Sequence, residues 1–307
     1  MKRVIEYRPF SYLKEYESFF FGISQNKEVG DVVEGSLVAF SALISIVSEV
    51  ESKLISLINE GKSDGFVETI ITLLLRKVAE DLDAISILYS KCAFLPAQLI
   101  LRSLVETTVY IEYILEMDVE YRASAYYLHH LYEEKDMMEK QIDADKKQAK
   151  PIINADVLSA WKKKELAFNA LVKKRPTFVE VDKKRNQLNK CNNWYKLCNV
   201  NSFRDLMNKM GYGDLYDPIY RSMSSEVHGA SSASQLRFVD TESEIKLIRS
   251  PLLGGTVFSL SSSFTIGSIE KVLEYFKDGE YADEFKVFKA DYFKTHDKVV
   301  ADFERIT

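Results

Sequence analysis

Glycine and proline are scarce in this chain, which has 12 glycines and 6 prolines among 307 residues. Sandwiches, barrels and doubly wound sheets need many tight turns, and these two residues make most of them. A chain with so few turn residues is therefore expected to be mostly helical. Its 46% hydrophobic and 28% charged residues are enough to bury a substantial core, which excludes a disordered or fibrous protein.

Apolar residues recur every three or four positions along most of the chain, as they do on the buried face of a helix. The clearest stripe lies between two glycines, in residues 35–61, and includes Leu37, Phe40, Leu43, Ile44, Val47, Val50, Leu54 and Ile58. Similar stripes predict helices over 66–91 and from the turn that contains Pro96 to about residue 117. Further helices are predicted over 118–150, 156–175, 179–190, 202–210, 216–229, 256–276 and 282–305.

One segment has the alternating pattern of β-strands instead. Polar and apolar residues alternate over 235–239 and 244–248, on either side of a short turn sequence, which predicts a small hairpin. We find no internal repeat and no low-complexity linker. The sequence therefore predicts an all-α protein, a multi-helix bundle in a single domain of residues 1–307, with one small hairpin.

Cysteine content and hydropathy indicate the compartment. Three cysteines are too few for a disulfide framework and favour a reducing environment. The first ten residues carry charges in place of an apolar signal segment, and the longest uncharged stretch, 250–269, is too rich in Ser, Thr and Gly to span a membrane. We expect a cytoplasmic protein with no membrane contact.

Charge is distributed unevenly along the chain. The net charge is −5, but the segment between Lys140 and Lys190 holds 14 Lys and Arg against 6 Asp and Glu, so it carries +8 and the remainder carries −13. We call this the basic segment. It contains three runs of three consecutive Lys or Arg residues, 162–164, 173–175 and 183–185, which we call its triplets. Such a stripe is expected of a surface that faces phosphate. The alternative is the solvated face of long helices.

The common nucleotide, hydrolase and zinc motifs are absent from the sequence. His129 and His130 each have a glutamate four residues on, a pairing that could hold a metal only if other helices supplied ligands. Cys191 and Cys198 lie seven apart with no histidine beside them, so we interpret them as packing thiols. The sequence therefore predicts no metal and no cofactor.

A charged pair stands within the helix predicted to begin near Pro96. Arg102 and Glu106 are spaced to pair along a segment that is otherwise apolar, and Glu80 and Arg122 are candidates for further members. One interpretation is an internal ion-pair network that fixes helix register. The other is a polar pocket whose arginine binds an anionic ligand.

The strongest catalytic candidate is the segment Tyr220-Arg221-Ser222-Met223-Ser224-Ser225-Glu226-Val227-His228-Gly229. On an α-helix, seven residues at about 100° each place Arg221 and His228 on one face, about 10 Å apart along the axis. A histidine exchanges a proton near neutral pH and an arginine holds phosphate by forked hydrogen bonds, which suffices in kind for metal-free attack of a ribose 2′-hydroxyl on its own phosphodiester. The alternative is a hydrogen-bonded histidine that closes a short helix.

The Arg221-x6-His228 pattern in a helical chain resembles the Arg-x4–6-His motif of HEPN domains (higher eukaryotes and prokaryotes nucleotide-binding), many of which are metal-independent ribonucleases of toxin and phage-defence systems. The same residues, with Leu75-Arg-Lys, Ile87-Leu-Tyr-Ser and Ala97-x3-Leu101-Arg-Ser-Leu-Val-Glu106, further resemble a bacterial family of uncharacterised helical proteins. The HEPN resemblance implies that Arg221 stabilises the scissile phosphate, that His228 acts as acid or base, and that two subunits line one cleft.

The resemblance has one departure, because many active members have Asn, Asp or His after the arginine and this chain has Ser222. We expect a metal-independent endoribonuclease of toxin or phage-defence type, a homodimer that grips RNA with the basic segment and has an antitoxin or defence partner. The alternative is a non-catalytic helical module that binds a nucleotide or a protein. The residues expected to bind the ligand are Arg102, Glu106, Arg122, Tyr220, Ser224 and Ser225.

Overall fold

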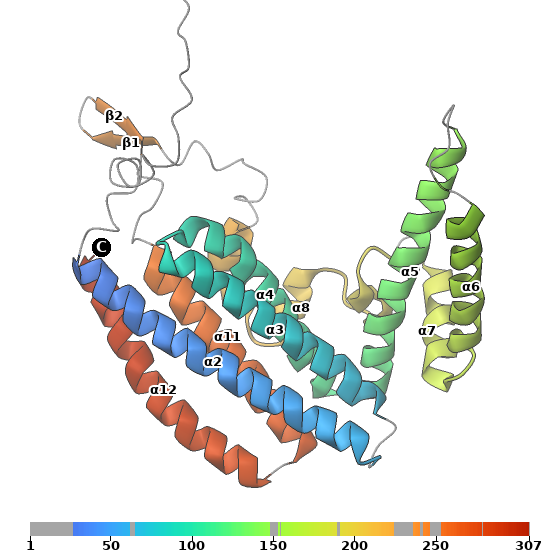
Figure 1. Cartoon of the computed structure of the whole chain (residues 1–307), viewed down its shortest axis with the longest axis horizontal. Coiled ribbons are helices and arrows are strands. Elements are labelled where there is room, and N and C mark those ends of the chain that lie inside the picture. The colour runs from blue at the N-terminus through green and yellow to red at the C-terminus, as the bar shows by residue number, and fades with distance from the viewer. Residues whose placement is uncertain are drawn as a thin grey trace, which may run out of the picture. The chain divides into compact units, whose positions relative to one another are not determined.

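The protein is all-α, as the sequence predicts (Figure 1). The computed structural model describes residues 27–61, 65–147, 153, 155–188, 191–223, 236–239, 242–245, 253–277 and 279–306. The predicted hairpin is present: β1 (Leu236–Val239) pairs antiparallel with β2 (Glu242–Ile245), with Leu236 opposite Ile245. The second strand begins two residues earlier than predicted.

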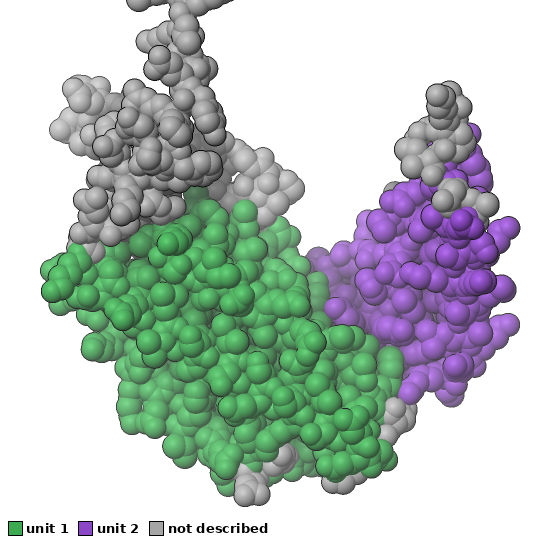
Figure 2. Space-filling model, in the orientation of Figure 1, with its two compact units in different colours: residues 1–112, 214–307 green, residues 113–213 purple. Residues whose placement is uncertain are grey.

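The chain divides into two compact units (Figure 2). Unit 1 comprises residues 1–112 and 214–307, and unit 2 comprises residues 113–213, which include the basic segment. The first division falls inside helix α4 and the second follows Gly213 directly. No linker sequence separates the units, which is why composition alone does not reveal them.

Long helices make up unit 1: α2 (Lys27–Asn59), α3 (Phe66–Ser90), most of α4 (Phe94–Glu116), α11 (Gly254–Phe276) and α12 (Gly279–Ile306). Helix α2 packs against α3 and α12, and α11 contacts all three (Figure 1). A short helix, α9 (Gly213–Leu215), leads into a π-helical turn, η4 (Tyr216–Arg221). The periodic stripes therefore predicted the long helices nearly to the residue.

The start of α2 is the exception, because the sequence analysis placed a helix end at Gly35. The helix begins at Lys27 and runs through both Gly30 and Gly35. Val29, Val32 and Val33 continue the buried stripe upstream. Burial of these side chains outweighs the roughly 1 kcal/mol that a glycine costs inside a helix.

Helix α2 is also long and apolar enough to cross a membrane, by length and composition only. Phe40, Leu43 and Val47 of its apolar stripe are fully buried within unit 1, whereas Leu37, Ile44 and Ile58 are partly buried. A core helix of a soluble protein has this arrangement, so the structure is consistent with a soluble protein.

Aromatic rings fill the centre of unit 1. The Tyr89 ring lies 5.2 Å from Phe40 and 4.6 Å from Phe94, centroid to centroid, in edge-to-face contacts. Its buried hydroxyl donates a 2.8 Å hydrogen bond to the carbonyl of Gly254, at the start of α11. A Cβ atom at Gly254 would lie 2.4 Å from the ring of Phe303, so α11 needs a glycine there to approach α12.

Unit 2 is built from one long polar helix and several shorter elements: α5 (Val119–Lys146), α6 (Ala155–Val172), α7 (Pro176–Gln187), the 3₁₀ turn η3 (Trp194–Cys198) and α8 (Phe203–Lys209). Helix α7 packs against α5 and α6, and η3 packs against α5 and α7. Pro176 is the first residue of α7, where a missing N–H is tolerated. Ser202 caps α8, because its Oγ accepts a hydrogen bond from the Asp205 amide at 3.1 Å.

Candidate functional site

Three side chains of unit 1 form a polar cluster beside the Arg221 motif. Helix α4 places Arg102 and Glu106 one turn apart, and the Arg102 Nε donates to Glu106 Oε1 at 3.0 Å. Tyr220, from η4, donates its hydroxyl proton to the same oxygen at 2.5 Å, and its oxygen accepts from Arg102 Nη2 at 2.9 Å. We call this group the Tyr220 anchor. It brings together residues 114 or more positions apart in the chain.

The electrostatics of the Tyr220 anchor keep it locked near neutral pH. Burial raises the pKa of Tyr220, and the adjoining Glu106 raises it further. Burial lowers the pKa of Arg102, but Tyr220 and Glu106 outweigh that effect and leave the pKa above its ordinary value. The phenol therefore stays protonated and the guanidinium stays charged, which makes the cluster a fixed attachment between α4 and η4 and not an acid–base pair.

Arg221 points the other way. Tyr220 is buried, whereas the Arg221 side chain is 74% exposed and has Asp217 as its ion-pair partner at 3.5 Å. Exposed pairs of this kind contribute about 0–1 kcal/mol, so an anion can compete for the guanidinium. The π-helical turn thus places an anchored tyrosine and a solvent-facing arginine on consecutive residues.

Ser222, the departure from the HEPN pattern, directs its hydroxyl to its own turn. The Oγ atom donates to the carbonyl of Ile219 at 2.7 Å and to that of Pro218 at 3.0 Å. The other predicted residues of this segment, Ser224, Ser225 and His228, lie outside the described residues. The helix predicted over 216–229 begins as a π-helical turn up to Arg221 and continues as α-helix at Ser222 and Met223, and the predicted phase between Arg221 and His228 lies outside the described residues.

Arg122 belongs to unit 2 and is buried there. Its guanidinium carbon lies 3.7 Å from the centre of the Tyr113 ring, and its Nη1 donates to the Tyr113 carbonyl and, at 3.3 Å, to Glu116 Oε2. These partners account for Arg122 within unit 2, whereas the Tyr220 anchor belongs to unit 1. The grouping of Arg122 with Arg102 and Glu106 came from composition, which carries no information on tertiary partners.

The basic segment places several lysines in solvent. The exposed lysines of its three triplets are Lys162, Lys163, Lys164, Lys173, Lys174 and Lys183. Two arginines of the triplets are paired instead, Arg175 with Glu120 at 3.5 Å and Arg185 with Asp136 at 3.1 Å. The lysines of the triplets are therefore solvent-exposed and two of the arginines tie helices together, while binding of phosphate by the segment stays a prediction.

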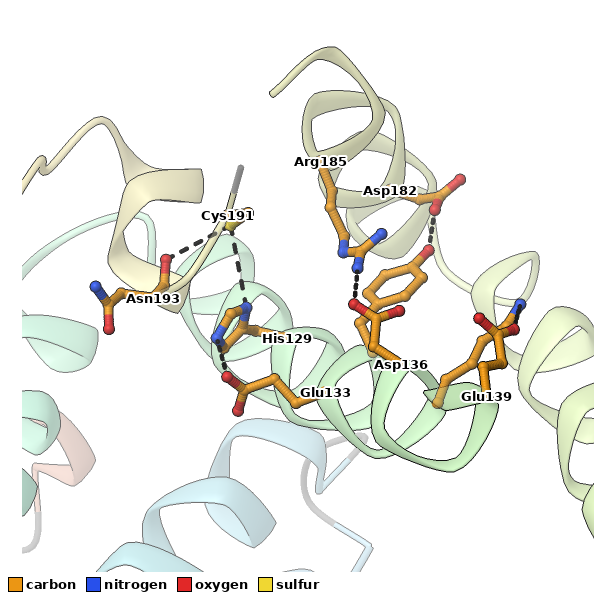
Figure 3. Close-up of polar contacts among 10 residues, drawn as sticks. His129, Glu133, Asp136, Glu139, Asp182, Arg185, Cys191 and Asn193 are labelled. Atoms are coloured by element: carbon orange, nitrogen blue, oxygen red, sulfur yellow. Dashed lines mark hydrogen bonds and ion pairs between the residues drawn. The ribbon is translucent and has the colours of Figure 1, made fainter. Parts of the chain in front are cut away.

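A polar network joins α5 to α7, and sequence spacing did not reveal it (Figure 3). The Tyr132 hydroxyl donates to Asp182, and the guanidinium of Arg185 lies 3.8 Å from the Tyr132 ring centre while donating to Asp136. These partners are about 50 residues apart, and only tertiary structure could have placed them together. The network adds polar links between two helices that also bury apolar side chains such as Leu128 and Val181.

His129 lies at one end of this network, between Cys191 and Glu133 (Figure 3). Its Nδ1 is 4.0 Å from Cys191 Sγ and its Nε2 is 3.3 Å from Glu133 Oε1. Burial raises the pKa of Cys191, which is opposite to the shift that activates a catalytic thiol. Burial also lowers the pKa of His129, although Glu133 opposes the shift, so we interpret the trio as a structural contact and not a catalytic one.

The predicted pairing of each histidine with a glutamate is present, with His130 and Glu134 3.7 Å apart. Among the residues that the structure describes, no three His, Cys, Asp or Glu side chains gather closely enough to hold a metal ion.

Comparison with known proteins gives a family but no activity. The model of a family of unknown function (DUF5677) matches residues 68–246, which include the Tyr220 anchor, Arg221 and all of unit 2. No curated protein and no solved structure matches the chain.

Proposed function

The chain belongs to this family of unknown function, DUF5677, and we propose that it is a metal-independent endoribonuclease in which Arg221 and His228 act on one phosphodiester. The observation that carries the proposal is the pairing of a buried Tyr220 with an exposed Arg221 on consecutive residues. The Tyr220 anchor holds the backbone of η4 against α4. The side chain of the following residue, Arg221, therefore extends from a fixed backbone position at the surface of unit 1.

The π-helical form of this turn supports the proposal. Such turns are rare and occur frequently at functional sites. The extra residue lowers the stability of the helix, so a fold seldom keeps such a turn unless it serves a function. A guanidinium presents paired N–H donors that match two oxygens of a phosphate. Arg221 is therefore suited to hold the scissile phosphate and to stabilise the charge that develops on it.

The proposed chemistry is an internal transfer within the RNA. His228 or a second base takes the proton of the 2′-hydroxyl, the 2′-oxygen forms a bond to phosphorus, and the bond from phosphorus to the 5′-oxygen breaks. The leaving oxygen receives a proton from the conjugate acid. The products carry a 2′,3′-cyclic phosphate and a 5′-hydroxyl, and no metal ion is needed.

The biological setting belongs to the proposal as well. We propose a cytoplasmic homodimer of toxin or antiviral-defence type, in which the lysines of the basic segment hold the RNA backbone and an antitoxin or defence partner restrains cleavage. An exposed lysine surface of this kind supports RNA binding through phosphate contacts that are sensitive to salt.

The test is cleavage of cellular RNA by the purified protein in EDTA. We expect fragments that end in 2′,3′-cyclic phosphate, and loss of cleavage in His228→Ala and Arg221→Ala. The matched control is Arg305→Ala, because Arg305 is also an exposed arginine of unit 1, with an aspartate 3.3 Å away. Intact RNA with folded wild-type protein under every condition of salt, pH and partner addition would overturn the proposal.

The second candidate is a non-catalytic module that binds a nucleotide or a partner protein. Ser222 favours it, because its hydroxyl is engaged with its own helical turn where active HEPN members often have Asn, Asp or His. This candidate predicts that RNA or nucleotide raises the melting temperature without being cleaved, and that the shift survives His228→Ala but not Arg221→Ala.

A further inference from the structure

A pocket of about 490 Å³ lies between α5 and α6, wholly within unit 2. We call it the α5–α6 pocket. Its walls are aromatic and apolar, with Tyr127 and Leu131 from α5 and Trp161 and Phe168 from α6. The volume falls within the range of sites that bind small organic groups.

Neighbouring rings support two of these walls. Phe168 meets the ring of Tyr132 edge to face at 4.9 Å, and Tyr127 lies 6.2 Å from Phe178. Phe178 and Tyr132 are themselves buried. Trp161 is half-buried, so one surface of its indole remains accessible at the pocket.

Lysines line the same pocket. Lys135 is neutralised by Glu165 at 3.2 Å, and Glu134 has His130 at 3.7 Å. Lys164 and Lys174 are exposed, and no ion-pair partner lies near either of them within the part of the chain that the structure describes. The pocket thus combines an aromatic and apolar lining with two exposed lysines, next to Glu134 and Glu165 with their partners His130 and Lys135.

From this combination we propose that the α5–α6 pocket binds one unstacked base of single-stranded RNA, with Lys164 and Lys174 on the flanking phosphates. Aromatic rings bind bases of any sequence because every base has a π-face, and lysines bind the backbone next to them. The inference rests on the proposed function only in the choice of RNA as ligand. It names a site in unit 2 that is separate from the Arg221 motif.

The experiment uses Trp161 as its own reporter. The chain has two tryptophans, and the other, Trp194, is buried among Tyr113, Tyr126 and Tyr195. The probe is a 2′-O-methyl oligouridylate of roughly ten nucleotides, in the range that nucleic-acid grooves cover. It cannot be cleaved through its 2′-oxygen, so binding is measured independently of nuclease activity. We expect saturable quenching of Trp161 fluorescence, and the same quenching in Trp194→Phe.

Two double variants separate the pocket from general charge. Lys164→Gln with Lys174→Gln should weaken binding by about tenfold, in line with two lost phosphate contacts. Lys163→Gln with Lys173→Gln removes the same charge from adjacent exposed positions outside the pocket and should weaken binding much less. Equal loss in the two double variants would leave only nonspecific attraction and overturn the proposal.

An abasic oligonucleotide of the same charge isolates the role of the base. It should bind several-fold more weakly than the oligouridylate and should not quench Trp161. Equal affinity and equal quenching would overturn base binding. If RNA is never cleaved but these binding results hold, the nuclease proposal is wrong and the base-binding proposal is supported. If cleavage depends on Arg221 but Trp161 is never quenched, the nuclease proposal is supported and the base-binding proposal is wrong.

Discussion

The two units of this protein are stabilised in different ways. Unit 1 has a core of aromatic rings that includes Phe40, Tyr89 and Phe303, all of them almost completely buried. Unit 2 has fewer buried apolar side chains, and its helices α5 and α7 are joined by the contacts of Tyr132 with Asp182 and of Arg185 with Asp136. Unit 1 also has polar links, such as Arg76 with Glu51 between α2 and α3, so the comparison is one of degree: apolar burial is more extensive in unit 1, and polar contacts contribute more to the α5–α7 pairing in unit 2.

This difference is consistent with the two proposed roles, in which unit 1 carries the Arg221 motif and unit 2 binds the RNA backbone. Apolar burial holds the helices that carry the Tyr220 anchor independently of pH and salt. Unit 2 is rich in lysine, and its net positive charge limits how closely its helices can pack unless carboxylates are paired with the arginines. Stability in unit 2 should therefore respond to charge and pH in a way that stability in unit 1 does not.

The largest expected effect tests the aromatic core of unit 1. Phe40→Ala should lower the free energy of unfolding by about 3–5 kcal/mol, because it leaves a cavity between Tyr89 and Phe258. Val38→Ala, two residues away on α2 and 66% exposed, should change it by less than about 0.5 kcal/mol. Urea unfolding followed by circular dichroism measures both. Similar losses in the two variants would contradict a core centred on these rings.

A smaller effect is expected for the polar link in unit 2. Arg185→Ala removes the hydrogen bond to Asp136 and the cation–π contact with Tyr132, and should cost about 1–3 kcal/mol. Hydrogen exchange should become faster in α5 and α7 and stay unchanged in α2 and α3. Lys183→Ala, an exposed neighbour on α7, is the control and should leave all four helices unchanged. Faster exchange in α2 and α3 would show that the units do not respond separately.

Acid should weaken unit 2 through His129. Burial lowers the pKa of this histidine in the folded protein, so its contribution to stability is present above its unfolded pKa of about 6.5 and is lost as the pH falls through the folded pKa. The facing groups are Glu133, Arg185, His130 and Cys191. Hydrogen exchange of α5 between pH 7 and pH 5 measures the effect.

The control for this pH dependence is the adjacent histidine. His129→Gln should remove part of the acid sensitivity of α5, whereas His130→Gln should not, because the His130 side chain is 63% exposed. The same acid sensitivity in wild type and His129→Gln would assign the effect to other groups.

Sequence reasoning succeeded where burial alone determines structure. The stripe over 66–91 gave α3 nearly to the residue, and the four-residue spacing of Arg102 and Glu106 gave their ion pair. It failed where a third partner comes from a distant segment, as Tyr220 does. Periodicity indicates which side chains are buried, but it does not indicate which other side chains they contact. Neither the Tyr220 anchor nor the two units could therefore be deduced from it.

The π-helical turn is a second kind of limit. The sequence analysis assumed α-helical phase from residue 216 onward, but residues up to Arg221 adopt a wider turn. Tyr220 of this turn hydrogen-bonds to Arg102 and Glu106 of α4, and a local pattern contains no sign of that tertiary contact. The same limit applies to unit 2, where the partners of Arg185 lie on another helix.

The smallest expected effect is at Asp217, the exposed partner of Arg221. Asp217→Asn should change the free energy of unfolding by less than about 0.5 kcal/mol, because both side chains are more than half exposed and the pair spans 3.5 Å. It should nevertheless raise the affinity for RNA at low salt, since it removes a negative charge beside the guanidinium that we propose binds phosphate. Asp302→Asn, which removes the partner of Arg305, should change neither quantity. A loss of stability above 1 kcal/mol in Asp217→Asn would mean that Arg221 is held by the fold of unit 1 and is not available to a substrate.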